Sequence, residues 1–173
     1  DAFFVDCGIT YSGASTATIT GLDHLEGETV SVLGDGAAHP DKTVSAGQIT
    51  LDRNVTKAHV GLAFDAQGAT LRFDIGAQNG TSQGKVQRIY QMAFRLNSTS
   101  AMKAGPSFTA LDEVLFRTSD DLTNTPIPPF TGDKPIDWDG DYSTEAQVCW
   151  SRDKPMPCTV LALMPQLMTE DRN

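Results

Sequence analysis

Apolar and polar residues alternate with a period of two in several short runs, and this alternation is the main structural signal of the sequence. In the run 28–33, Val30 and Val32 share one side while threonine and serine occupy the other. The runs 48–52 and 57–64 follow the same pattern. Because successive side chains of a strand point to opposite faces, we predict strands of about five to eight residues over these ranges.

Short segments between these runs have the composition of tight turns. Gly34-Asp35-Gly36 consists of residues that tolerate positive φ, and Ala46-Gly47 and Arg53-Asn54 are short enough to join neighbouring antiparallel strands. Residues 19–64 are therefore predicted to form a compact antiparallel β unit.

The stretch around Tyr90–Leu96 is compatible with two kinds of element. Its apolar residues alternate as in a strand, but residues 86–94 also fit the three-and-four spacing of a helix. We predict a strand, because the polar segment 97–100 ends the run abruptly and the neighbouring segments are β.

Three further strands are predicted at 113–117, 147–150 and 158–164. The last is apolar on both faces, which is typical of a strand covered from both sides. Prolines cannot donate to a ladder, so Pro155, Pro157 and Pro165 are expected to mark its ends. The predicted class is all-β with little helix: an antiparallel β-sandwich or barrel framework (1–18 and 65–173) that carries a small inserted barrel-like module (19–64).

Two long stretches are predicted to be loops. Residues 65–85 are rich in Gly, Gln, Asn and Ser, and residues 118–141 contain four prolines and several aspartates. Loops of this length in a compact domain are usually functional or ordered by a partner.

Length and charge restrict the possible partners. The chain has 173 residues, 13 basic and 22 acidic, for a net charge of −9. An acidic surface repels phosphate backbones, which argues against electrostatic binding of nucleic acid. The sequence has no run of about 18 apolar residues and no basic-then-apolar start, so we expect no membrane insertion.

No arrangement of residues predicts an enzyme. His24 is expected to be packed and hydrogen-bonded, His39 to lie in a turn, and His59 to face outward. No nucleophile elbow or phosphate-binding loop is present, so we expect no catalytic, cofactor-binding or metal-binding residues. The spacing of Cys7, Cys149 and Cys158 does not fit a zinc site; free thiols are expected, and a Cys149–Cys158 disulfide is the alternative.

The densest group of carboxylates is Asp137-Trp138-Asp139-Gly140-Asp141. Alternating aspartates can bind calcium, but the glycine stands at the fourth position of this stretch and Val148 stands where a bidentate glutamate is needed. We therefore interpret the segment as an exposed acidic turn. Together with Tyr142 it forms a candidate contact loop, whose residues are Asp137, Trp138, Asp139, Asp141 and Tyr142.

A specific resemblance is carried by the segments GLDHLEGETVSVLGDG (21–36), HPDKTV (39–44), ITL (49–51) and HVGL (59–62). It continues with KVQRIY (85–90), FRL (94–96), FTGD (130–133) and the segment 148–165. These residues resemble the carboxy-terminal part of tail proteins of tailed bacteriophages, of the nozzle or tail tubular protein B type and related hub proteins. The sequence departs from that pattern at Ala63-Phe64 and in the polar insert 65–84.

The resemblance implies a structural protein of the virion, located in the phage tail. It implies a ring of identical subunits, often six, which contacts neighbouring tail, adaptor or fibre proteins and surrounds the channel through which DNA leaves without specific binding. It also implies that Asp1 is an internal residue of a longer parent.

Two other functions are considered. One is a carbohydrate-binding module for host-surface adhesion, in which Trp138, Tyr142 and Trp150 would stack on sugar rings. The other is a hydrolase of surface polymers, which would need two carboxylates about 5 to 9 Å apart in a cleft.

Overall fold

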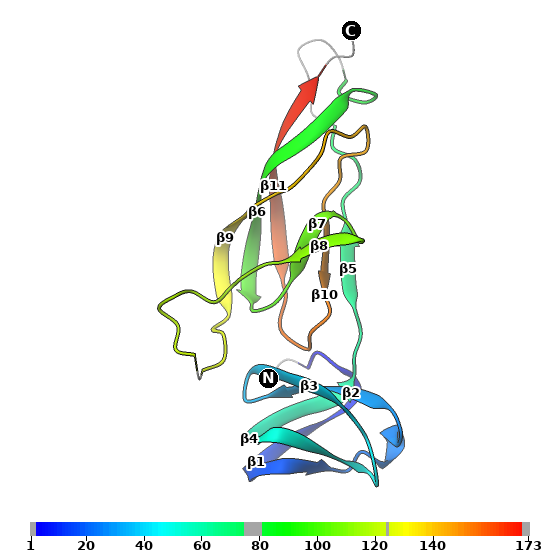
Figure 1. The fold of residues 1–173 in the computed structure, drawn as a ribbon, viewed down its shortest axis with the longest axis vertical. Helices are drawn as coiled ribbons and strands as arrows, with labels where there is room; N and C mark the ends of the chain where they lie inside the picture. Colours follow the sequence, from blue (N-terminus) through cyan, green and yellow to red (C-terminus); the bar gives the residue numbers. More distant parts are fainter. Residues whose placement is uncertain (1–2, 75–80, 124, 171–173) are drawn as a thin grey trace. The chain divides into compact units, whose positions relative to one another are not determined.

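The computed structural model describes residues 3–74, 81–123 and 125–170. In this part of the chain, eleven strands form three antiparallel sheets, and the only helical element is the short 3₁₀ turn η1 (Asp23–Leu25) (Figure 1). The all-β prediction is confirmed. The described chain divides into two compact units: a first unit of residues 3–65, 116–123, 125–128 and 152–157, and a second unit of residues 66–74, 81–115, 129–151 and 158–170.

The first unit contains one four-stranded sheet with the order β1-β4-β2-β3. Its strands are β1 (Asp6–Thr20), β2 (Thr29–Gly34), β3 (Ala37–Thr43) and β4 (Gln48–Leu62). The predicted turn at Arg53-Asn54 is wrong, because these residues lie inside the continuous strand β4. The register between β1 and β4 shifts there, since Thr16 pairs with Val55 but Thr18 pairs with Thr50. Such an irregularity bends a strand without ending it.

The expected division of the chain between residues 18 and 19 falls inside β1. This strand pairs with β4 from Asp6 to Thr20, so residues 6–18 belong to the same sheet as the predicted module 19–64. The first unit is therefore larger than the module that the sequence suggested.

Two predicted tight turns are present in the first unit. Asp35 and Gly36 have φ angles of 47° and 83°, and Ala46 and Gly47 have φ angles of 53° and 66°. Positive φ at both central residues is the geometry of two-residue hairpins that match the twist of the strands. The carboxylate of Glu26 accepts hydrogen bonds from the backbone N–H groups of Ala46 and Gly47, at 2.9 and 2.8 Å, and so holds the second turn.

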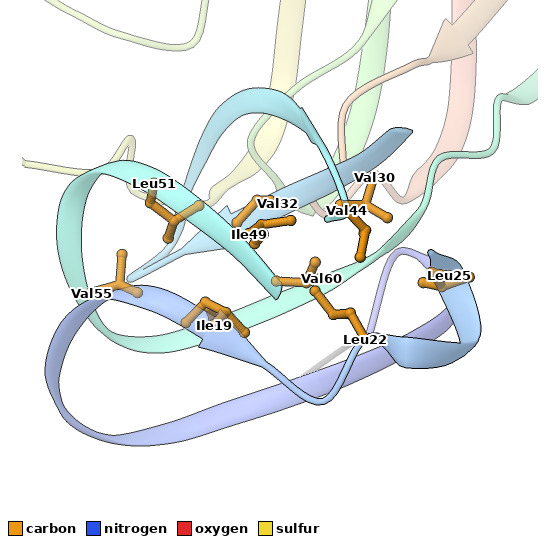
Figure 2. Close-up of a cluster of buried hydrophobic side chains, with 11 residues drawn as sticks. Ile19, Leu22, Leu25, Val30, Val32, Val44, Ile49, Leu51, Val55 and Val60 are labelled. Atoms are coloured by element: carbon orange, nitrogen blue, oxygen red, sulfur yellow. The ribbon is translucent and has the colours of Figure 1, made fainter. Parts of the chain in front are cut away.

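The core of the first unit lies inside its curled sheet. Eleven buried side chains form one cluster, which Figure 2 draws as sticks with ten of them labelled. They come from β1, β2, β4, the turn η1 with the residue before it, and the segment between β3 and β4. Its members are Ile19, Leu22, Leu25, Val30, Val32, Val44, Ile49, Leu51, Val55, Ala58 and Val60. The alternating residues of the runs around Val30 and Ile49 thus bury the faces that their period predicts.

The second unit contains two sheets. One has the order β11-β6-β9, with β6 (Val86–Thr99), β9 (Phe130–Ile136) and β11 (Val160–Glu170). The other has the order β5-β10-β7-β8, with β5 (Ala66–Ala69), β7 (Lys103–Ser107), β8 (Ala110–Glu113) and β10 (Cys149–Arg152).

Strand β6 confirms the strand prediction for residues 90–96. Met92, Phe94 and Leu96 are fully buried while their neighbours on the opposite face are not, and Phe94 meets the ring of Trp150 edge-on at 6.5 Å. The central strand therefore carries the core of this unit.

Other predictions for the second unit are corrected. The run 113–117 contributes only Glu113 to a strand, and the last strand covers 160–170 instead of 158–164. Both predicted loops contain a strand, β5 and β9 respectively. Pro165 lies within β11 and Pro135 within β9, although prolines were expected to lie outside strands. Both strands are at the edges of their sheet, where a missing N–H is tolerated.

Strand β11 is also not covered from both sides, as was predicted. None of its eleven residues is buried, and Leu161 and Met168 remain 60% and 49% exposed. The strand is apolar on both faces, but within the described chain only β6 pairs with it.

Candidate functional site

The candidate contact loop lies in the second unit, after β9. Asp137, Asp139 and Asp141 are exposed and have no hydrogen-bond or ion-pair partner among the described residues. Trp138 is half-buried and lies against Gly140. A Cβ atom added to Gly140 would lie 2.8 Å from Nε1 of the indole. That indole nitrogen is buried without a hydrogen-bond partner. The tryptophan ring therefore contributes to the packing of the turn, and the carboxylates form its solvent-facing side.

Strand β6 holds this loop in place. The Nε of Arg88 donates a hydrogen bond to the carbonyl of Gly140 at 2.9 Å, and the guanidinium lies 5.6 Å from the ring centre of Tyr142. Tyr142 is 44% exposed, and its hydroxyl donates to the sulfur of Met168 on β11 at 3.7 Å. Within the described ranges, no three His, Cys, Asp or Glu side chains are grouped as metal ligands.

A pocket of about 860 Å³ lies in the first unit, and we call it the Arg53 pocket. Its wall is formed by the β2–β3 hairpin, by β4 near Arg53, and by residues 117, 123, 125–127 and 153–156. Its volume is within the range of small-molecule sites. The charged residues that line it are Asp35, Asp41, Arg53, Arg117, Asp153 and Lys154.

The central polar contact of the pocket joins β3 to β4. The Nε of Arg53 donates a hydrogen bond to Nε2 of His39 at 3.0 Å. His39 is buried, and burial together with the positive charge of Arg53 lowers the pKa of its imidazole. Because Nε2 accepts this hydrogen bond, the neutral ring carries its proton on Nδ1. A neutral, buried histidine thus fixes the direction of the guanidinium.

Gly34 makes this arrangement possible. A Cβ at this position would lie 2.6 Å from Nε2 of His39 and 2.7 Å from a methyl group of Val55. Distances of this kind are too short for real side chains, so the absence of a Cβ lets the imidazole lie against the strand.

Two carboxylates of the pocket already have protein donors. Asp35 accepts hydrogen bonds from the backbone N–H groups of Thr56 and Lys57 and from the Thr56 hydroxyl. Burial raises the pKa of Asp35, but these hydrogen bonds and nearby Arg53 outweigh it and hold the pKa below its ordinary value. Asp41 accepts from the hydroxyl of Ser31 at 2.7 Å.

Arg117 shapes the opposite wall of the pocket. Its two terminal nitrogens donate to the carbonyls of Leu122 and Thr125, at 2.7 and 2.9 Å. Asp121 accepts from the N–H and hydroxyl of Thr118, and these hydrogen bonds lower the pKa of its carboxyl. Much of the predicted loop 118–141 is therefore held by contacts within the chain itself.

The histidines are only partly where the sequence placed them. His39 lies in β3 and not in a turn. His59 does not face solvent: it is 8% exposed, it meets the ring of Phe3 edge-on at 5.4 Å, and its Nδ1 lies 2.9 Å from the Thr10 hydroxyl. His24 is hydrogen-bonded as expected, to the carbonyl of Cys7 at 2.7 Å, but it is exposed and not packed.

The Arg53 pocket itself was missed. His39 and Arg53 lie 14 residues apart on strands that are not neighbours in the sheet order, so no local pattern joins them. The only sequence signal for the pocket was Gly34-Asp35-Gly36. A tight turn at these residues makes β3 run back along β2, and the glycine at position 34 leaves space beside the turn.

No disulfide joins any of the three cysteines. Cys149 is buried, Cys158 is half-buried and Cys7 is exposed. The free-thiol prediction is therefore confirmed, although Cys7 is not in a core. Burial raises the pKa of the Cys149 thiol and so makes it less reactive at neutral pH.

Comparison with known proteins gives no further guide to the site. No protein-family model matches the sequence, and a search of curated proteins found no match. Among the described residues, no helix is sufficiently long and apolar to cross a bilayer.

Proposed function

We propose that this chain is a structural subunit of a bacteriophage tail, of the nozzle or hub type, which assembles with identical copies. Strand β11 is the observation that carries the proposal. It has six large apolar residues on an edge strand, yet none is buried: Val160, Leu161, Leu163, Met164, Leu167 and Met168. Exposed apolar edge strands are prone to associate, and native proteins usually blunt or cover them. A neighbouring copy would cover this one.

The charge of the chain supports the same function. A wall around a DNA channel must not hold its cargo, because each neutralised phosphate adds affinity. A net charge of −9 avoids such contacts. In this proposal the subunits form a ring, DNA passes through it without specific binding, and other faces of the ring contact further tail, adaptor or fibre proteins.

The mass of the chain in solution tests the proposal. We expect native mass spectrometry of the full chain to show multiples of 18.6 kDa that increase with concentration. Leu161→Lys should shift the chain toward monomer, because it places a charge in the proposed contact. The matched control is Leu115→Lys, since Leu115 is 74% exposed in the same unit but outside β11. A chain that stays monomeric at all concentrations, or two variants with equal effects, would contradict the proposal.

The geometry gives less support to the carbohydrate-binding alternative. Trp138 packs on Gly140, and Trp150 lies so close to Gly68 that a Cβ there would be 2.3 Å from its ring. Of the three rings in this alternative, only that of Tyr142 is exposed, at 44%, and Arg88 approaches it. Binding on a glycan array that is lost in Trp138→Ala would favour this alternative.

A further inference from the structure

We propose that the first unit contains an acid-sensitive switch, in which protonation of His39 and His59 loosens its sheet while the second unit keeps its structure. All three histidines of the sequence, His24, His39 and His59, belong to the first unit. Histidine is the only side chain whose ordinary pKa lies between pH 5 and 8. We therefore expect a change of pH within this range to alter the charge of the first unit far more than that of the second.

His39 and His59 lie on either side of β2, at neighbouring points along it. His39 on β3 pairs with Val32, and His59 on β4 pairs with Leu33. Because successive residues of a strand point to opposite faces, the two imidazoles lie on opposite faces of the sheet. Both side chains are buried, with exposed fractions of 7% and 8%. Protonation of both rings would therefore place a buried charge on each face of the sheet, beside its inner strand β2.

The contact of His39 with Arg53 requires a neutral imidazole. Nε2 of His39 accepts the Nε–H of Arg53 at 3.0 Å, whereas a protonated imidazole carries a hydrogen on both nitrogens and can accept nothing. Arg53 is exposed and can turn toward water, but the ring of His39 lies directly against the backbone of β2. A Cβ at Gly34 would be only 2.6 Å from its Nε2. Protonation thus leaves a charged ring in a buried position without this partner.

The other charges around His39 do not favour the protonated ring enough to offset its burial. The charged side chains that act on it or share its pocket, among the described residues, comprise four acidic and four basic groups: Asp35, Asp41, Asp52, Asp153, Lys42, Arg53, Arg117 and Lys154. Burial, and then the charge of Arg53, lower the pKa of the imidazole despite the nearby aspartates. Desolvation and the direct contact with Arg53 therefore decide which form the folded state prefers.

His59 has even less electrostatic support for a second proton. Its ring meets that of Phe3 edge-on at 5.4 Å, and its Nδ1 lies 2.9 Å from the hydroxyl of Thr10 on β1. The described charged group that acts on it is Lys57 of the same strand, which is also positive. Burial, and then this charge, lower the pKa of the His59 imidazole.

These lowered pKa values couple protonation to opening of the sheet. A histidine whose pKa is lower in the folded state than in the open state takes up a proton when the sheet opens. Its stabilising contribution is therefore complete above about pH 6.5 and is lost as the pH falls toward the folded-state pKa. At pH 5.5, each histidine that stays neutral in the folded state favours opening by up to about tenfold. The inference does not depend on the proposed ring, which rests on β11.

Hydrogen exchange of the full chain at pH 7.5 and pH 5.5 tests the switch. Carboxylates titrate mainly below this range, so histidines dominate the response. After correction for the intrinsic pH dependence of exchange, we expect the protection of β2 to fall by about tenfold or more at pH 5.5. The protection of β6, in the second unit, should change by less than about twofold. Unchanged protection of β2, or an equal loss in both units, would overturn the inference.

Variants identify the histidines that carry the response. The double variant His39→Gln/His59→Asn should keep the protection of β2 equal at the two pH values within about twofold, because neither new side chain titrates and the glutamine oxygen can still accept from Arg53. His24→Gln is the matched control, since His24 is exposed, and it should respond as the wild type does. Each protein is compared with itself at two pH values, so a loss of stability common to both does not count as a response. A double variant that responds like the wild type, or a control that does not respond, would overturn the inference.

An NMR titration of the wild-type imidazoles gives a second readout that does not depend on the variants folding. We expect His39 and His59 to become protonated at lower pH than the histidine of an unfolded peptide. Protonation of both rings at or above the pH found for the peptide would overturn the switch, because the folded state would then not resist the charge.

Discussion

The sheet of the first unit and the β11-β6-β9 sheet of the second unit use similar residues in different ways. In the first unit, strands β1, β2 and β4 and the segments between strands contribute to one closed cluster of eleven buried side chains. In the second unit, β6 buries Met92, Phe94 and Leu96, but its neighbour β11 buries none of its residues. The difference lies in what covers the strands and not in how apolar they are.

This comparison distinguishes two patterns of apolar residues along a strand. An alternating stretch such as residues 48–52 of β4, in which Ile49 and Leu51 are buried and their neighbours are exposed, is completed by its own sheet, which curls around its inner face (Figure 2). A strand such as β11, apolar on both faces and located at an edge, is not completed within the described chain. The first pattern indicates a core, and the second is the pattern on which the proposed contact between copies rests.

The largest expected difference between the two regions is the cost of removing one leucine side chain. Leu22 is fully buried in the first unit, so Leu22→Ala should lower the free energy of unfolding by about 2 to 5 kcal/mol. Leu161→Ala on β11 should change it by less than about 0.5 kcal/mol in the dilute chain. Urea denaturation followed by far-ultraviolet circular dichroism measures both; similar costs would mean that β11 is as well packed as the first unit.

A smaller effect is expected from adding one methyl group beside the Arg53 pocket. Gly34→Ala places a Cβ against His39 and Val55, so it should destabilise the first unit by about 1 to 3 kcal/mol. The matched control is Gly27→Ala, because a Cβ at Gly27 meets no atom within 4 Å; its cost should come only from the positive φ of 82°. Thermal unfolding that is unchanged in Gly34→Ala would contradict the packing described for His39.

The smallest effect concerns pH and the β2–β3 turn. Hydrogen bonds hold the pKa of Asp35 below its ordinary value, so its stabilising contribution is present above about pH 4 and is lost as the pH falls through the folded-state pKa. Asn tolerates the positive φ of this position, so Asp35→Asn removes mainly the charge. We expect a loss of about 1 kcal/mol at pH 7, limited by solvent screening, and almost none at pH 2.

Urea midpoints at both pH values measure this difference. Asp139→Asn is the control, because Asp139 has no hydrogen-bond partner among the described residues and should show no such pH dependence. An Asp35→Asn penalty that is equal at the two pH values would show that the charge of the turn carboxylate does not contribute.

Local features of the fold were predictable and nonlocal ones were not. The turns at Asp35-Gly36 and Ala46-Gly47 follow from residues that accept positive φ, and β6 follows from its alternation. Most of β1 was missed because a run of Thr, Ser, Gly and Ala carries little apolar signal, and β9 because Gly132 and Pro135 resemble loop residues. These strands are specified by their partners, β4 and β6, more than by their own composition.

The candidate sites show the same limit. The acidic contact loop is contiguous in the sequence and could be found there, but the packing of Trp138 on Gly140 depends on the fold. The contact between His39 and Arg53 needs the sheet to curl so that β3 approaches β4, and no spacing in the sequence encodes that approach.

Hydrogen exchange of the backbone amides of β11 tests the central claim most directly, with those of β4 as the internal reference. In dilute solution we expect β11 to exchange faster than β4, because β11 is an uncovered edge and β4 lies between two strands. As the chain is concentrated, protection should increase in β11 and remain constant in β4. Protection of β11 that does not change with concentration, while the chain is shown to associate, would contradict the claim that this strand is the contact between copies.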